Sequence, residues 1–390
     1  MTCWTSSSSS RSRLAVLLGA VVLGDAVLAG CAAARLVPAP DRPSRIALLP
    51  PENLADAQAP LAELGGWTEA ALARAGIEVV SGDLVERFAV KRRIRYLGGL
   101  DRATALAAAE ELGVDGVLIT SLTQHDASDP PRFGLVARLV STTERPDVFW
   151  IDGASAAGDD APGLMGLGLV HRLEPLARGV LARLSGSLAS FLEGRTGRSQ
   201  PCPSQGRFQP RTVYRAAVAT EGKPATVAVL PFQNSSHRSR AGEIVALEVV
   251  RQLSAVKRFT VLEPGLVREN LLRYRIVTEG GVSLENARAA LATMEADYVL
   301  AGTVRQYEEG RGDGATPQAD FTVIMIDTHT NETVWHSTST GTGIDGVHFF
   351  GLGRVSTGTE LTCRLVRGVV DRMAEAPEAR RPTFIEQLTR

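Results

Sequence analysis

The sequence predicts an α/β (α+β) protein made of two tandem copies of one mixed-sheet domain. The main observation is an internal repeat: residues 84–122 align without gaps with residues 266–304 at a constant offset of 182. A repeat of this length indicates duplication of a whole domain, because solenoid repeats are about 20–50 residues long. A second observation is that one order of strand and helix patterns fits both copies.

The repeat extends to both sides of this segment. Matching pairs are residues 46–50 with 227–231, Trp150 with Trp335, residues 166–168 with 351–353, and residues 176–180 with 365–369. We therefore expect a first domain at residues 44–194, a second at 224–376 and a tail at 377–390. Residues 195–223 between them are rich in Pro, Gly and Ser, which is typical of an exposed linker.

The second copy gives the element order most clearly. Residues 227–232 are a short apolar run typical of a buried strand, and residues 240–254 carry apolar side chains at helical spacing. A strand, two helices around Gly280 and Gly281, a three-strand meander and a closing helix follow. The order β-α-β-α-α-β-β-β-α predicts parallel crossovers, then an antiparallel meander, with helices covering the sheet.

The start of the chain indicates export and lipid attachment. Arg11 and Arg13 precede an apolar run at residues 14–24, which fits a signal peptide and is too short to cross a bilayer. Residues 27–31, Val-Leu-Ala-Gly-Cys, follow as a lipobox. We expect a signal peptide at 1–30, a lipidated Cys31 and a tether at 31–43. An ordinary secretory signal or a short membrane anchor is the alternative.

Lipidation at Cys31 predicts a membrane location. Two or more acyl chains, such as a diacylglyceryl group with a palmitate, anchor a protein stably, so membrane lipid is the first expected partner. Ala32 follows the cysteine, where lipoproteins kept in the inner membrane often carry Asp. We therefore expect an outer-membrane lipoprotein that faces the periplasm.

Two cysteines, Cys202 and Cys363, remain after Cys3 leaves with the signal peptide and Cys31 is acylated. The cell envelope permits disulfides, so these two residues are candidates for a bond between the linker and the last helix. Two free thiols are the alternative.

Neither the composition nor any motif of the sequence indicates catalysis or a cofactor. The formal net charge of −1 argues against a nucleic-acid binder, which would carry a basic excess. The six histidines form no metal-ligand spacing, and the chain contains no nucleophile elbow, phosphate loop or dinucleotide fingerprint. We expect a protein that is not an enzyme and has no cofactor, metal site or catalytic residue.

Three segments of the second copy carry a family resemblance. They are the strand at residues 227–234, the short strand at 260–263 and Ala-Asp-Tyr-Val-Leu-Ala-Gly-Thr-Val at 296–304. The pattern resembles the fold of the curli-secretion channel lipoproteins, the amino-terminal domain of the Tol translocation protein TolB and the lipoprotein activators of penicillin-binding proteins. The hairpin loop at 308–319 is short and polar, unlike a membrane-spanning hairpin, so no pore is expected.

The resemblance and the anchor together suggest a function. We expect a non-catalytic envelope protein that binds periplasmic or membrane partners and assists or regulates a cell-wall synthesis or secretion machine. The expected partners are a cell-wall synthase or secretion subunits. One alternative is a self-assembling structural subunit, which would be a homo-oligomer. The other is an envelope small-ligand binder or an unrecognised enzyme.

Overall fold

A computed structural model describes residues 42–55, 58–161, 167–204, 206–216, 223–276, 278, 280–290, 294–312, 314–348 and 353–375. The expected signal peptide, Cys31, nearly all of the tether and the tail lie outside these residues. Within the described ranges, no helix combines the length and apolar character needed to cross a bilayer.

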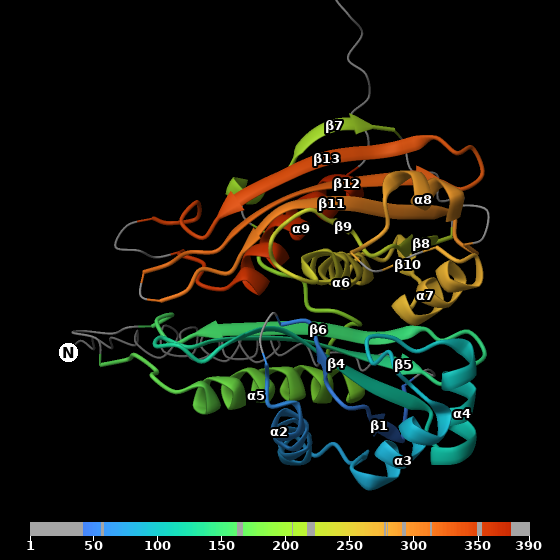
Figure 1. Cartoon of the computed structure of the whole chain (residues 1–390), viewed down its shortest axis with the longest axis vertical. Helices are drawn as coiled ribbons and strands as arrows, with labels where there is room; N and C mark the ends of the chain where they lie inside the picture. The colour runs from blue at the N-terminus through green and yellow to red at the C-terminus, as the bar shows by residue number, and fades with distance from the viewer. Residues whose placement is uncertain are drawn as a thin grey trace, which may run out of the picture. The chain divides into compact units, whose positions relative to one another are not determined.

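The first copy contains six strands and four helices within the described residues (Figure 1). In chain order they are β1 (Ile46–Leu48), β2 (Glu52–Asn53), α2 (Leu61–Arg74), β3 (Val79–Val80), α3 (Asp83–Arg92), α4 (Arg102–Leu112), β4 (Gly116–Asp126), β5 (Arg132–Ser141), β6 (Val148–Ala157) and α5 (Leu173–Leu192).

The second copy repeats this order. Its elements are β8 (Ala225–Val229), β9 (Gln233–Asn234), α6 (Ala241–Ser254), β10 (Phe259–Val261), α7 (Pro264–Arg273), α8 (Leu284–Ala290), β11 (Tyr298–Glu308), β12 (Gln318–Asp327), β13 (Thr333–Thr342) and α9 (Gly358–Ala374). Apart from the two-residue strands β2 and β9, this is the predicted order.

Each copy forms one mixed sheet. The strand order is β3-β1-β4-β5-β6 in the first copy and β10-β8-β11-β12-β13 in the second, where β7 (Arg211–Arg215) from the segment between the copies adds to the edge at β13. β1 pairs in parallel with β3 and β4, as β8 does with β10 and β11. The strands that follow are antiparallel. The predicted fold class, with parallel crossovers before an antiparallel meander, is confirmed.

The repeated residues have the same local roles in both copies. The Asp115 carboxylate accepts the backbone N–H of Ser44 at 2.8 Å, and the Asp297 carboxylate accepts that of Thr226 at 2.7 Å. Each aspartate thus joins the central strand of its sheet to the first one. Such side chain-to-backbone bonds satisfy donors that the strand ladder leaves unpaired. The repeat is therefore a repeat of structural contacts as well as of sequence.

Helices cover the sheets in layers. In the first copy, α2 and α5 pack on one face through a core that includes Leu118, Leu135 and Trp150. Residues of α3 and α4 pack on part of the opposite face, against Val117 and Ile119. The rest of that opposite face lies against α6 and α9 of the second copy, which Figure 1 shows between the two sheets.

The two copies share one apolar core. Val136 and Ile151 of the first sheet belong to the same buried cluster as α6, α9 and the inner face of the second sheet. Fully burying a Val or Ile side chain stabilises by about 1.5–3 kcal/mol. The contact between copies is therefore part of the folded core.

The segment at 195–223 differs from the expected exposed linker. Within its described residues, a short helix η2 (Gly206–Phe208) buries Phe208 against α9, and β7 (Arg211–Arg215) pairs antiparallel with β13. Cys202 is also buried. The Pro, Gly and Ser content indicated exposure, but apolar side chains inside the segment dock it on the second copy.

Candidate functional site

The first copy presents a covered face to the second. We define the covered face by the positions of Ser121, Gly134, Val136, Arg138, Ile151 and Gly153, which lie on one side of β4, β5 and β6. Val136 is 1% exposed. A Cβ atom on Gly134 would lie 2.4 Å from Thr359 Oγ1 on α9, so only glycine permits this approach.

A buried ion pair crosses this junction. Arg138 Nε donates to Glu263 Oε2 at 3.3 Å, and both side chains are at most 1% exposed. Glu263 also accepts the backbone N–H of Leu100 at 3.0 Å. Burial acts to lower the pKa of Arg138, but the nearby carboxylate of Glu263 raises it, and the net pKa lies above its usual value. The guanidinium is therefore charged at all physiological pH values.

Two further arginines of the second copy reach into the first. Arg238 donates to the carbonyl oxygens of Leu54 and Thr123, both at 3.0 Å. Arg251 donates to Asp152 Oδ1 at 2.8 Å. Removing one partner of a buried charged pair costs about 3–5 kcal/mol, because the other charge stays uncompensated. These contacts fix the orientation of α6 against the first sheet.

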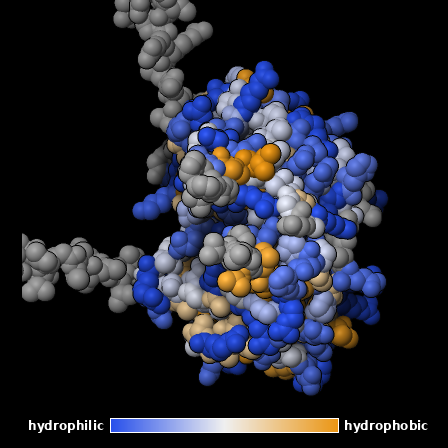
Figure 2. Space-filling model, turned by 90° about the vertical axis from the view of Figure 1, so that its left-hand side faces the viewer, coloured by the Kyte–Doolittle hydropathy of each residue, from blue (hydrophilic) through white to orange (hydrophobic). Residues whose placement is uncertain are grey.

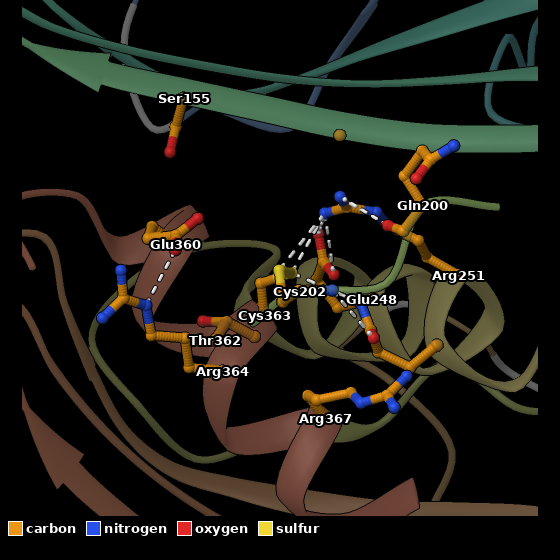
Figure 3. The surroundings of a disulfide bond; sticks show 12 residues. Ser155, Gln200, Cys202, Glu248, Arg251, Glu360, Thr362, Cys363, Arg364 and Arg367 are labelled. Atoms are coloured by element: carbon orange, nitrogen blue, oxygen red, sulfur yellow. Dashed lines mark hydrogen bonds and ion pairs between the residues drawn. A yellow bond between two sulfur atoms is a disulfide. The ribbon is translucent and has the colours of Figure 1, made fainter. Parts of the chain in front are cut away.

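A disulfide joins Cys202 of the segment between the copies to Cys363 of α9, with the two Cα atoms 6.0 Å apart. Figure 3 shows Arg251 and Glu248 beside it. Arg251 Nη1 lies 3.3 Å from Glu248 Oε1 and 3.0 Å from Cys363 Sγ. Burial raises the pKa of Glu248, although Arg251 lowers it. The cross-link therefore lies beside the ionic contacts of the junction.

Glu52 is a further buried carboxylate at the junction. It accepts a hydrogen bond from Ser121 Oγ at 2.6 Å. A Cβ atom on Gly98 would lie 1.9 Å from Glu52 Oε1, so the repeated glycine leaves room for the carboxylate. Burial raises the pKa of Glu52, and the hydrogen bond from Ser121 opposes this shift. The carboxylate lines a cavity between the copies, together with Tyr96 and Arg138.

The second copy presents an open face at the positions equivalent to the covered face. The strand registers place Thr322 where the first copy has Val136, Ile324 where it has Arg138, and Asp320 where it has Gly134. We define the open face as Thr303, Arg305, Asp320, Thr322, Ile324, His336, Thr338 and Thr340. These side chains are half-buried or exposed. Figure 1 shows the outer side of β12 and β13 without a covering helix in the described part of the chain, apart from α8 at one end.

The open face is polar. Arg305 Nε donates to Asp320 Oδ2 at 3.1 Å, and this pair is exposed to solvent. A different face of the molecule, shown in Figure 2, is mostly hydrophilic, with hydrophobic residues in separate small groups. Because the open face itself is polar, it would recognise a partner through hydrogen bonds and charge together with shape.

Two of the six histidines lie in β13 or in the turn before it. His329 is exposed and His336 lies on the open face. In the described ranges, no group of three or more His, Cys, Asp or Glu side chains is placed to hold a metal ion. Glu309, directly after β11, pairs with Arg238 at 2.9 Å and is largely buried. Cys31 lies outside the described residues.

Sequence reasoning missed Arg138 and Glu263. A signal for Arg138 was present, because it is a charged residue inside the otherwise apolar run at 133–140. A charge in a buried strand needs a partner. Nothing local identifies that partner, since Glu263 lies 125 residues away.

Three of the solved structures that match this chain are the following. PelC from Paraburkholderia phytofirmans, a dodecamer, is 20% identical over 43% of this chain and 99% of its own, with a TM-score of 0.32. Lipoprotein GNA1162 from Neisseria meningitidis is 18% identical over 39% and 99%, with a TM-score of 0.28. LpoB from Escherichia coli is 15% identical over 31% and 59%, with a TM-score of 0.25.

No family model matches the chain, and no curated protein matches it. LpoB belongs to the penicillin-binding-protein activator lipoproteins, a group that the sequence resembles. The similarity concerns the fold, and at these identities and TM-scores it carries no conclusion about activity or partners.

Proposed function

We propose that this chain is a non-catalytic, lipid-anchored envelope protein that binds a protein partner through its open face. The observation that carries the proposal is the difference between equivalent positions in the two copies. Val136 of the covered face is 1% exposed, whereas Thr322 of the open face is half-buried and has solvent on one side. The covered face of the first copy is thus occupied by the second copy. The open face of the second copy is left for another molecule.

The expected occupant of the open face is an α-helical surface of an envelope protein. The covered face supports this expectation, because it receives the two helices α6 and α9 on the same strand framework. Thr322, His336 and Thr338 supply hydrogen-bonding groups at the centre of the open face. A polar helical surface suits these groups better than an apolar one.

The proposed lipid at Cys31 gives this surface its place of action. A tethered binding site meets a membrane-bound partner at a raised effective concentration, so a weak contact suffices. We propose the outer membrane as the site of attachment, with the domains in the periplasm. A cell-wall synthase or a secretion subunit is the proposed class of partner, which this protein would assist or regulate.

The test is site-specific photocross-linking in intact cells. A photoreactive amino acid replaces Thr322 on the open face or, as the matched control, exposed Glu86 on α3. We expect a cross-linked product from position 322 and little from position 86, with the partner's cross-linked peptide mapping to a helix of an envelope protein. Cys31→Ala in the same background should lower the yield of the product. Equal products from both positions, or none from position 322, would refute the proposed surface.

Self-assembly is the second candidate function, and one observation favours it. The contact between the copies is head-to-tail, with the sheet face of one on the helices of the other. Heterologous contacts of this kind generate rings or filaments when they repeat between chains. In that case the product from position 322 would map to α2 or α5 of this same protein. Light scattering in mild detergent would then show a large species.

A further inference from the structure

A cavity of about 620 Å³ lies between the two copies, on residues that the proposed function does not use. Arg95 and Tyr96 of the first copy, just after α3, form one wall. The second copy supplies Arg240 and Glu243 at the start of α6 and Arg268 on α7. Ligand sites typically occupy about 300–1,000 Å³ and occur between domains. The size and position of this cavity are therefore those of a small-molecule site.

The lining of this cavity is strongly cationic. It contains three guanidinium groups and one carboxylate, so its net charge is about +2. Arg240 pairs with Glu243 at 2.9 Å, whereas Arg95 is exposed. The amino-terminal end of α6, which begins at Ala241, lies at the same wall and adds partial positive charge. An anion with two negative charges would match this lining.

Arg268 is held in position for such a ligand. Its guanidinium lies 4.4 Å from the centre of the Tyr96 ring, and its Nη1 donates to Thr278 Oγ1 at 2.9 Å. These two contacts come from different copies, so the side chain bridges the junction. Burial raises the pKa of the Tyr96 hydroxyl, which therefore stays protonated and can donate a hydrogen bond.

A narrower cavity of about 60 Å³ shares Tyr96, Glu243, Arg268 and Thr278 with the larger one. Its remaining lining combines the apolar side chains of Val229, Leu247 and Val250 with the buried charged side chains of Glu52 and Arg138. The combined space thus has a wide cationic part and a narrow part whose walls are apolar on the side of Val229, Leu247 and Val250 and charged at Glu52 and Arg138. A ligand that fills both parts carries an anionic group and a short apolar chain.

We propose that this junction cavity binds a phosphate monoester with a short apolar tail, with Arg95, Arg240 and Arg268 contacting the phosphate. A phosphate monoester carries about −1.5 to −2 charges at pH 7, so it matches the lining better than a carboxylate does. Arginine also suits phosphate, because its planar fork of donors can bond two oxygens at once. Because both copies form the walls, a bound ligand strengthens their contact.

The test is titration of the full chain in mild detergent with hexyl phosphate, followed by calorimetry and by thermal unfolding. We expect saturable binding and a rise in Tm, because a ligand that binds only the folded state stabilises it. Hexanol, inorganic phosphate and hexylammonium serve as comparison probes. We expect hexyl phosphate to bind tighter than inorganic phosphate, and neither hexanol nor hexylammonium to bind.

The variants separate this site from adventitious binding. Arg95→Gln should weaken hexyl phosphate binding by about ten- to a hundredfold, because it removes a charge-assisted hydrogen bond to the phosphate. Arg95 is exposed, so the variant should fold. Arg178→Gln on α5 removes another exposed arginine, which lies outside the cavity, and should leave binding unchanged. An absence of binding, or equal losses in both variants, would overturn the proposal.

A short-chain lipid distinguishes a phosphate on a lipid headgroup from a free phosphate ester. Dihexanoyl phosphatidic acid carries the same phosphate group on a lipid headgroup and is soluble as a monomer. Tighter binding of this lipid than of hexyl phosphate, abolished in Arg95→Gln, identifies a lipid ligand; the reverse order identifies a free phosphate ester. Photocross-linking from position 322 is independent of these residues, so failure of either proposal is distinguishable from failure of the other.

Discussion

The covered face of the first copy and the open face of the second are built on the same strand pairing, but they are buried to different extents. The first has Gly134, Val136 and Arg138 on β5, and the second has Asp320, Thr322 and Ile324 at the equivalent points of β12. The difference shows that a duplicated backbone does not make two equivalent binding surfaces. Side chains at a few positions decide which face packs into the core.

Gly134 and Asp320 illustrate this most directly. A Cβ atom at Gly134 would lie 2.4 Å from Thr359 Oγ1. An aspartate in its place would therefore keep a helix like α9 from approaching as closely. Asp320 also holds Arg305 in an exposed ion pair. The open face is thus shaped for a partner that approaches differently from α9.

The largest expected effect comes from the buried ion pair of the covered face. Arg138→Met keeps the volume of the side chain but leaves the Glu263 carboxylate buried without its cation. We expect the free energy of unfolding to fall by about 3–5 kcal/mol. The matched control is Arg305→Met in the exposed pair of the open face, which should cost about 0–1 kcal/mol. Denaturant unfolding of both variants measures the difference, and equal losses would contradict the assignment of the two faces.

Loss of the disulfide should have the next largest effect on the free energy of unfolding. We expect Cys363→Ser to lower the free energy of unfolding by about 2–5 kcal/mol, because it frees α9 from Cys202. The measurement is chemical unfolding with and without reductant, and the unreduced protein should contain no titratable thiol at these two positions. In the presence of reductant, wild type and variant should unfold alike. A variant as stable as the oxidised wild type would exclude a structural role for the bond.

A methyl group added at the junction should have a smaller effect. A Cβ atom at Gly265 would lie 2.3 Å from the backbone nitrogen of Leu100 in the other copy. Gly265→Ala should therefore cost about 1–3 kcal/mol through overpacking. Gly186→Ala on α5, where no atom lies within 4 Å, should instead stabilise by about 0.4–1 kcal/mol. Thermal unfolding should shift in opposite directions for the two variants.

The smallest expected effect is a dependence on pH. Glu52 of the first copy corresponds to Gln233 of the second, where the residue is exposed. Burial raises the pKa of Glu52, so the folded state holds the proton more tightly than the unfolded state. The stabilisation of the folded state by protonated Glu52 is complete below the ordinary pKa of 4.5. It is lost as the pH rises through the folded-state pKa.

The substitution Glu52→Gln removes the ionisable carboxyl group and therefore this loss of stability at higher pH. We expect the variant to equal wild type near pH 4 and to be more stable than wild type at pH 7, because the amide carries no proton that the folded state must lose. Unfolding curves at several pH values between these limits provide the measurement. A variant that is less stable than wild type at pH 7 would show that the carboxylate is stabilised in its charged form.

The sequence by itself determined the architecture of each copy. The repeat, the apolar strand runs and the helical spacing predicted the element order and the mixed sheet, because these patterns depend on local backbone geometry and on which side of an element is apolar. The recurring aspartates, Asp115 and Asp297, make the same backbone contact in both copies.

Only the tertiary structure decided how the two copies meet. The pairing of Arg138 with Glu263, the burial of Phe208 and the cavity beside Arg268 all join residues far apart in the chain. A local pattern shows that a side chain is apolar or charged, but not which remote surface complements it. Closeness of approach, as at Gly134 and Thr359, depends on atoms from both surfaces at once. For that reason one face became core and its duplicate stayed open.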